Sequence, residues 1–202
     1  MNRINKPSPR IAALLAAAAL ALTGCGATAP AAEPPLAGAD IGGDFALTNS
    51  AGETVRWDDF AGQYRVVYFG YAFCPDICPT DMQRVAQGLK VLKAADPDTA
   101  AKITPIFITI DPDRDTRQVV GEFAAAFSPD IIGLTGTPEQ IAAAAKAFRV
   151  FYAKGEAVDG GGYLVDHSNI VYLFGPNGEP LATLPVDQGA DAVATELARW
   201  VS

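Results

Sequence analysis

From about residue 40 onward, apolar residues follow the patterns of alternating strands and helices. Two nearly continuous apolar runs, residues 65–71 and 103–110, predict strands that are buried on both faces. Between them, apolar residues recur at helical spacing from Met82 to Leu92, and Pro97 follows, so a helix is predicted there. Shorter patterns predict the other elements: a hairpin of 45–48 and 53–56, a helix over 116–127, a strand over 131–134, a hairpin of 169–174 and 180–184, and a final helix over 191–200.

Turn and cap residues between these elements support the same order. Thr-Pro-Glu-Gln at 137–140 is a capping box with proline at the first helical position, so a helix is predicted to begin there. Gly-Pro-Asn-Gly at 175–178 is typical of a hairpin turn. Strands that alternate with helices, followed by a hairpin and a last helix, predict an α/β fold. We expect a thioredoxin-like three-layer sandwich with a central mixed sheet and an N-terminal β-hairpin.

The first 24 residues have the three parts of an export signal. Arg3, Lys6 and Arg10 form a basic start, and the apolar stretch 11–22 is too short to span a bilayer. Leu-Thr-Gly-Cys at 22–25 resembles the lipobox of bacterial lipoproteins, in which the cysteine is acylated and becomes the mature N-terminus. The alternative is an ordinary cleaved signal followed by a chance cysteine. We expect a lipid on Cys25 that anchors the protein to a bacterial membrane on its periplasmic face.

Behind the signal, the chain divides into a short linker and one domain. Residues 25–39 contain three prolines and repeated alanine and glycine, so they predict a lipidated, flexible tether. Residues 40–202 carry all the predicted elements and show no internal repeat. They are long enough for one domain with a substantial core.

Charge excludes several classes of function. The chain of 202 residues has 15 Lys plus Arg against 23 Asp plus Glu, and the signal holds three basic residues and no acidic one. The mature chain therefore has 12 basic against 23 acidic residues, a net charge of −11. Such a surface argues against nucleic acid as a partner and is repelled by anionic headgroups. A basic docking face on a protein partner would suit it.

Two cysteines stand where the first central strand passes into a helix. They are Cys74 and Cys78, in the run Cys-Pro-Asp-Ile-Cys-Pro. Pro79 suits the first helical position, which would place Cys78 near the helix N-terminus, where the helix dipole lowers a thiol pKa. Two cysteines four apart can share a metal ion or form a disulfide, and in an exported protein a structural disulfide is the plain alternative.

The single histidine of the chain provides a third group. His167 lies just before the strand predicted at 169–174, which neighbours the central strand in a thioredoxin-type sheet. Two thiolates and one imidazole can then converge, although a lone histidine can equally be structural. Thiolates select Cu(I) or Zn(II), and a set with only one histidine favours copper. Asp76 and Asp166 stand beside the ligands and could orient them.

These residues carry a family resemblance. Cys-Pro-Asp-Ile-Cys-Pro at 74–79, Ile-Asp-Pro-Asp-Arg-Asp-Thr at 110–116 and Val-Asp-His-Ser at 165–168 resemble motifs of the Sco/SenC family, copper chaperones with a thioredoxin fold. Ala72 and Asn169 depart from the family pattern without touching a ligand. The resemblance implies that Cys74, Cys78 and His167 bind copper. It also implies that the partners are a periplasmic copper donor and the subunit that carries the binuclear copper centre of cytochrome c oxidase.

Four acidic residues after the second central strand allow another interpretation. Asp111, Asp113, Asp115 and Glu122 occupy positions 1, 3, 5 and 12 of an EF-hand loop. Thr116 replaces the glycine that such a loop needs at position 6, so calcium is disfavoured. We expect instead that Asp115 or Thr116 caps the following helix.

Three functions agree with the sequence. The first is a copper chaperone, a binding protein rather than an enzyme. The second is a thiol-disulfide reductase that uses Cys74 and Cys78 to keep the cysteines of the copper acceptor reduced. The third is an anchored domain held together by a structural disulfide between the same two cysteines.

Overall fold

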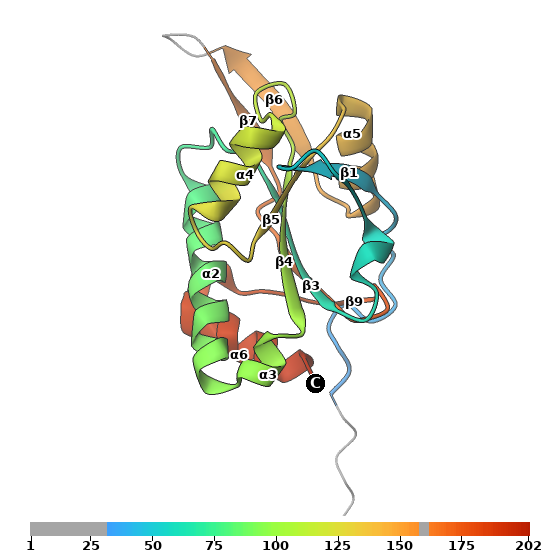
Figure 1. Cartoon of the computed structure of the whole chain (residues 1–202), viewed down its shortest axis with the longest axis vertical. Helices are drawn as coiled ribbons and strands as arrows, with labels where there is room; N and C mark the ends of the chain where they lie inside the picture. The colour runs from blue at the N-terminus through green and yellow to red at the C-terminus, as the bar shows by residue number, and fades with distance from the viewer. Residues whose placement is uncertain (1–31, 158–161) are drawn as a thin grey trace, which may run out of the picture. The chain divides into compact units, whose positions relative to one another are not determined.

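A seven-stranded mixed sheet forms the centre of the fold (Figure 1). The computed structural model describes residues 32–157 and 162–202. The strand order is β2-β1-β5-β4-β3-β8-β9, in which β3, β4 and β5 run parallel and the other pairs are antiparallel. The strands are β1 (Ala46–Asn49), β2 (Thr54–Arg56), β3 (Tyr64–Gly70), β4 (Ile103–Thr109), β5 (Ile132–Thr135), β8 (Val171–Phe174) and β9 (Pro180–Thr183). The predicted α/β fold with a mixed central sheet is confirmed.

Helices cover both faces of this sheet, which explains why all seven residues of β3 are buried. Tyr68 shares a face with Phe107 of β4, and Phe107 packs against Phe123 of α4. Phe69 points to the opposite face and packs against Phe148, just after α5. The helices are α2 (Ile77–Ala95), α3 (Pro97–Ala100), α4 (Arg117–Ala125), α5 (Pro138–Ala147) and α6 (Ala190–Trp200). Figure 1 shows α2 and α4 on one side of the sheet and α5 on the other.

Two helix starts follow the predicted chemistry. Thr137 and Gln140 form the capping box of α5: the Thr137 side chain accepts from the Gln140 N–H, and the Gln140 side chain accepts from the Thr137 N–H. The Thr116 hydroxyl caps α4 by accepting from the Val119 N–H at 3.4 Å. Of the two caps expected for α4, Thr116 is therefore the one used, and the Asp115 side chain is free for other contacts.

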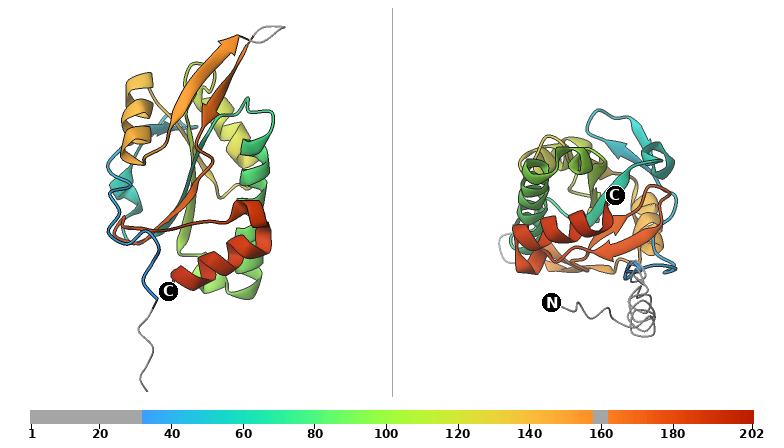
Figure 2. Two further views of the ribbon diagram at one scale, coloured as in Figure 1. Left: turned by 180° about the vertical axis from the view of Figure 1, so that it is seen from behind. Right: turned by 90° about the horizontal axis from the view of Figure 1, so that it is seen from below.

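A second, two-stranded sheet projects beyond the central one (Figure 2). It consists of β6 (Tyr152–Ala157) and β7 (Tyr163–His167), which pair antiparallel with Tyr152 opposite His167. The sequence pattern predicts no strands here. His167 ends β7, whereas the sequence placed it in the loop before the next strand.

Residues 34–39, within the segment that we predict to be a tether, form a turn that contacts the central sheet. The Leu36 N–H donates to the Leu181 carbonyl of β9 at 2.9 Å, and the Leu36 side chain packs against the core. Two turn hydrogen bonds, from Ala37 to Pro34 and from Ala39 to Leu36, complete this segment. Leu36 is the apolar residue that fixes the segment to the domain. The predicted signal, Cys25 and the start of the tether lie outside the described residues.

In the described part of the chain, three short helices lie where the sequence pattern predicts none. Two are 3₁₀ turns, Trp57–Phe60 and Val186–Gln188. The third is α3, which Pro97 begins, whereas we expected Pro97 only to follow the end of α2. Asp96 caps α3 by accepting from the Thr99 N–H at 3.0 Å, so the Asp-Pro pair starts a helix here as well as ending one.

No helix in the described ranges 32–157 and 162–202 has the length and apolar character needed to cross a membrane.

Candidate metal centre

The sheet topology brings the three predicted ligands together at the end of the central strand β3. Cys74 lies in the loop after β3, Cys78 lies in the first turn of α2, and His167 ends β7. Because β8 pairs antiparallel with β3, with Tyr68 opposite Val171, the segment that enters β8 passes the end of β3 where the cysteine loop begins. The predicted neighbourhood of these two strands is confirmed.

Helix α2 begins earlier than predicted. It starts at Ile77 with Asp76 at the N-cap, so Cys78 is the second helical residue and Pro79 the third. Proline is tolerated there because the first N–H groups of a helix have no intrahelical partner. The early start brings the Cys78 N–H to 3.5 Å from the Cys74 Sγ. The two cysteines are thus held side by side by the helix start itself.

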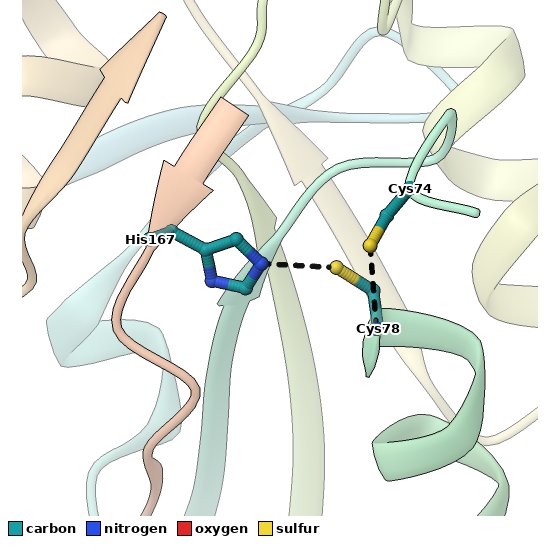
Figure 3. Close-up of side chains that lie close together, drawn as sticks. All are labelled: Cys74, Cys78 and His167. Atoms are coloured by element: carbon teal, nitrogen blue, oxygen red, sulfur yellow. Dashed lines mark hydrogen bonds between the residues drawn. The ribbon is translucent and has the colours of Figure 1, made fainter. Parts of the chain in front are cut away.

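The three side chains point toward one another (Figure 3). The Cys78 Sγ lies 3.2 Å from the His167 Nε2, and the ligand atoms of all three residues lie within 4.8 Å of one another. Bonds from a metal ion to nitrogen or sulfur ligands are about 2.0–2.3 Å long, so two ligand atoms on one ion lie at most about 4.6 Å apart. The three atoms are therefore nearly at the spacing that a shared ion requires. In the described part of the chain this is the one cluster of three or more His, Cys, Asp or Glu with such spacing.

Hydrogen bonding selects the tautomer of the imidazole. The His167 Nδ1 lies 2.9 Å from the Ser168 carbonyl oxygen, which can only accept, so Nδ1 carries the proton. The Nε2 lone pair is then free to bind a metal. The rings of Tyr68 and Tyr71 stand edge-on to the imidazole, with centroids 6.2 and 5.9 Å away. The imidazole is therefore oriented by its partners before any ion is bound.

Among the described residues, neither of the two aspartates that we expect to orient the ligands forms a side-chain hydrogen bond with one. Asp166 is exposed and lies opposite Ala153 in the β6–β7 pair, and the Ser168 carbonyl takes the orienting role expected of its carboxylate. Asp76 is also exposed, and it is the backbone carbonyl of this residue that accepts from the Thr80 hydroxyl. A neighbour in sequence projects to the other side of a strand, which is why Asp166 points away from the site.

The expected fall in the Cys78 pKa is wrong. The thiol is fully buried, and this burial raises its pKa above the usual value, as does the hydrogen bond with Cys74. The free-energy cost of burying a thiolate exceeds the stabilisation of its charge by the helix N-terminus, because the helix dipole contributes only about 0.3–1 kcal/mol. Both cysteines are free thiols, with Cys78 buried and Cys74 half-buried. Cys78 thus stays protonated until a metal ion displaces its proton.

The acidic motif after β4 serves a different purpose from calcium binding. The carboxylate of Asp115 accepts from the Ala72 N–H and the Thr109 hydroxyl, and that of Asp111 accepts from Tyr163 and Arg114. Both oxygens of Asp111 and the Oδ2 of Asp115 are engaged with protein donors, whereas the buried Oδ1 of Asp115 has no hydrogen-bond partner among the described residues. Sequence reasoning missed this network, because acidic residues before a helix are equally typical of a cap.

The fold and the site together define a thioredoxin-like protein with two thiols and one imidazole at the end of its central strand. A family model described as SCO1/SenC matches residues 33–202. The chain belongs to this family. It is 37% identical over 158 residues to the human "Protein SCO1 homolog, mitochondrial", which covers 78% of this chain and 52% of that protein. The chain thus spans about half the length of this curated relative.

Solved structures agree with the assignment. An Arabidopsis thaliana ScoI crystal structure "with copper bound" is 36% identical, has a TM-score of 0.73, and covers 79% of this chain and 97% of that one. A second structure is of BsSco, described through "a disulfide switch" and as "a member of the Sco family of cytochrome c oxidase assembly proteins". At 21% identity, a TM-score of 0.61, and coverage of 83% of this chain and 97% of that one, it shows a shared fold.

Proposed function

We propose that this protein is a copper chaperone that holds one copper ion on Cys74, Cys78 and His167. The observation that carries the proposal is the convergence of two sulfur atoms and one imidazole nitrogen within 4.8 Å. Copper is bound in the Arabidopsis relative, which shares this fold at 36% identity. Copper is the cargo of such a protein, so the function is delivery rather than turnover.

The donor set fits copper and its release. Thiolates are soft ligands that select Cu(I) or Zn(II), and closed structural zinc sites use four ligands. Here the described residues supply three, which leaves a bound ion open to a fourth ligand from another protein. Because such an incoming ligand can add before the first ones leave, the ion can pass from one protein to the next without becoming free.

The acceptor that we propose is the copper-bearing subunit of cytochrome c oxidase, with a periplasmic protein as the copper donor. Support comes from the family, since the BsSco relative is described as one of the cytochrome c oxidase assembly proteins. The net charge of −11 on the mature chain favours partners with a basic docking face. Association that does not weaken with added salt would exclude steering by this charge.

A lipid on Cys25 is the anchor that we propose. It rests on the basic start, the short apolar stretch and the Leu-Thr-Gly-Cys run of residues 1–25. We propose that residues 1–24 are removed, that a tether of 25–39 includes the ordered turn at 34–39, and that 40–202 form the copper-binding domain at the periplasmic face. Mass spectrometry of the membrane-extracted protein tests this: acyl chains on Cys25 support it, and an unmodified cysteine contradicts it.

Copper titration tests the central claim. Wild type should bind one Cu(II) with a thiolate-to-copper charge-transfer band, and one Cu(I) in competition with a chromophoric chelator. His167→Ala should lose the charge-transfer band, and the Cys74→Ala/Cys78→Ala double variant should lose both ions. Retention of two or more copper ions per chain, unchanged in the double variant, would refute the assignment.

A thiol-disulfide reductase is the second candidate. It is favoured by the two free cysteines, whose atoms approach to 3.5 Å between the Cys78 nitrogen and the Cys74 sulfur. A reductase does not need the imidazole, so the two functions separate at His167. If His167→Ala abolishes copper binding and oxidase maturation but leaves dithiol cycling intact, the chaperone function is the one that matters. If the variant still supports maturation of the oxidase, the reductase function is the one that matters.

A further inference from the structure

Asp115 is a fully buried carboxylate beside the metal site that neither binds metal nor caps a helix. Its Oδ2 accepts two hydrogen bonds, from the Ala72 N–H at 2.8 Å and from the Thr109 hydroxyl at 2.7 Å. Ala72 lies two residues before Cys74. One oxygen atom therefore joins the loop of the first cysteine to the end of β4.

The network continues toward the strand that carries His167. The Thr109 hydroxyl accepts from the Asp111 N–H at 2.9 Å, which ties the end of β4 to the next loop. The Asp111 carboxylate, also buried, accepts from the Tyr163 hydroxyl at 2.6 Å and from the Arg114 Nε at 2.5 Å. Tyr163 is the first residue of β7, and His167 is the last.

Arg114 closes the connection to β7. Its Nη1 donates to the Tyr163 carbonyl at 2.9 Å, and its guanidinium lies 3.7 Å from the centre of the Tyr163 ring. A separate and weaker contact, from the Val165 N–H to the Tyr71 hydroxyl at 3.3 Å, also links β7 to the end of β3. Loss of the acidic network would therefore loosen β7 without releasing it.

We propose that Asp115 and Asp111 are positioning residues, which hold the loop of Cys74 and the strand of His167 at the spacing that a shared copper ion needs. The inference deepens the proposed function and rests on it. Two buried carboxylates are a costly way to stabilise a fold, since apolar residues of similar volume often do as well. Their advantage is geometric, because each carboxylate accepts donors from two different segments and so sets the distance between them.

The single histidine of the chain makes the proposal measurable without metal. Its imidazole should give one set of NMR signals, whose chemical shifts in the metal-free protein depend on its contacts with the Cys78 Sγ, the Ser168 carbonyl and the rings of Tyr68 and Tyr71. Asp115→Ala removes the shared acceptor, so we expect the His167 signals to move toward those of a free histidine. Cu(II) affinity should fall about 10–100-fold, the range for losing a residue that orients a ligand. Cu(I) affinity should fall less than about threefold, because two thiolates suffice for this soft ion.

Three further variants separate positioning from loss of stability. Asp115→Asn keeps an oxygen acceptor and should retain the wild-type His167 signals. Thr109→Val removes one donor with little change of volume, and it carries the test if Asp115→Ala does not fold. Arg65→Met is the matched control, since Arg65 is buried at the opposite end of β3 and bonds there to the Gly175 carbonyl. It should lower the free energy of unfolding and leave the His167 signals in place.

The outcomes are distinguishable from those of the proposed function. Unchanged His167 signals in both Asp115→Ala and Thr109→Val overturn the positioning role. So does an equal shift in Arg65→Met, which would show a general response to destabilisation. If wild type binds no copper, the proposed function fails, and the metal-free signals alone then decide whether Asp115 positions the imidazole.

Discussion

Gly70→Ala is expected to damage copper binding more than it damages folding. Gly70 ends β3 directly against the metal site: a Cβ on it would lie 3.1 Å from the Cys78 Sγ, 3.0 Å from the Tyr68 ring and 3.1 Å from the Phe107 ring. All three of these side chains are buried. The added methyl group therefore has no free space, and a neighbour must move by a few tenths of an ångström.

Two opposing effects determine the change in stability. Losing the flexibility of glycine in the unfolded chain favours alanine by about 0.4–1 kcal/mol, whereas overpacking a core costs about 1–3 kcal/mol. We expect Gly70→Ala to lower the free energy of unfolding by about 1 kcal/mol. Copper is affected more, because ligand distances tolerate only about 0.2 Å, and the Cys78 Sγ is one of the atoms that the methyl group displaces. Copper affinity should fall about tenfold or more.

Gly88→Ala provides the matched control. A Cβ there would lie 2.5 Å from the Val193 Cγ1, where α2 packs closely on α6, and Gly88 is ten residues along the helix from Cys78, a rise of about 15 Å. The contact is shorter than any at Gly70, so overpacking should exceed the helix-propensity gain of about 1 kcal/mol and destabilise by about 2 kcal/mol. Copper affinity should stay within about twofold of wild type, because the site is not touched.

Urea denaturation of the metal-free variants and Cu(I) competition with a chelator measure the two quantities. We expect opposite rankings: Gly88→Ala the less stable variant, and Gly70→Ala the weaker copper binder. Wild-type copper affinity in Gly70→Ala, or an affinity that simply follows stability across both variants, would refute the reasoning.

Three further predictions concern a cap, a buried carboxylate and the loading of the site. Thr137→Ala removes the cap of α5 and should cost about 1 kcal/mol in urea denaturation; an unchanged midpoint would contradict this. Burial raises the pKa of Asp81, so the folded state favours the protonated carboxyl. The contribution of this carboxyl to the free energy of unfolding is fully present below its unfolded pKa and is lost as pH rises through the higher folded pKa. Asp81→Asn keeps an acceptor for the Tyr68 hydroxyl and should raise the free energy of unfolding at neutral pH, with a gain that disappears toward about pH 4; a gain independent of pH would count against it. Because burial raises the pKa of the Cys78 thiol, loading releases its proton, and apparent copper affinity should rise at least about tenfold per pH unit near neutrality; a flat profile in chelator competition would show that no proton is displaced.

Elements that bury most of their residues are those that the sequence pattern predicts best. β3 and β4 end within one residue of the predicted bounds, because a continuous apolar run bounded by turn residues is typical of a strand buried on both faces. The β6–β7 pair could not be predicted in this way. β6 reads Tyr-Ala-Lys-Gly-Glu-Ala, and the contacts that join the pair to the domain, such as the packing of Tyr163 on Arg114 and its hydrogen bond to Asp111, link distant segments of the chain.

The site shows the same division between local and distant effects. That Cys74 and His167 come together could be predicted, because strand neighbourhood follows from the fold class. The pKa of Cys78 could not, because it depends on which side chains bury the thiol rather than on its place in the helix. The roles of Asp111 and Asp115 were equally invisible, since their donors come from Ala72 and Tyr163 at distant positions in the chain.

The unequal burial of the three ligands determines from which side another protein can reach the site in the copper transfer that we propose. Cys78 is fully enclosed, whereas Cys74 and His167 are half-exposed, so an incoming ligand from another protein approaches from their side. In the transfer that we propose, copper therefore enters and leaves on the side of Cys74 and His167, while the enclosed Cys78 sulfur stays out of reach of the partner protein.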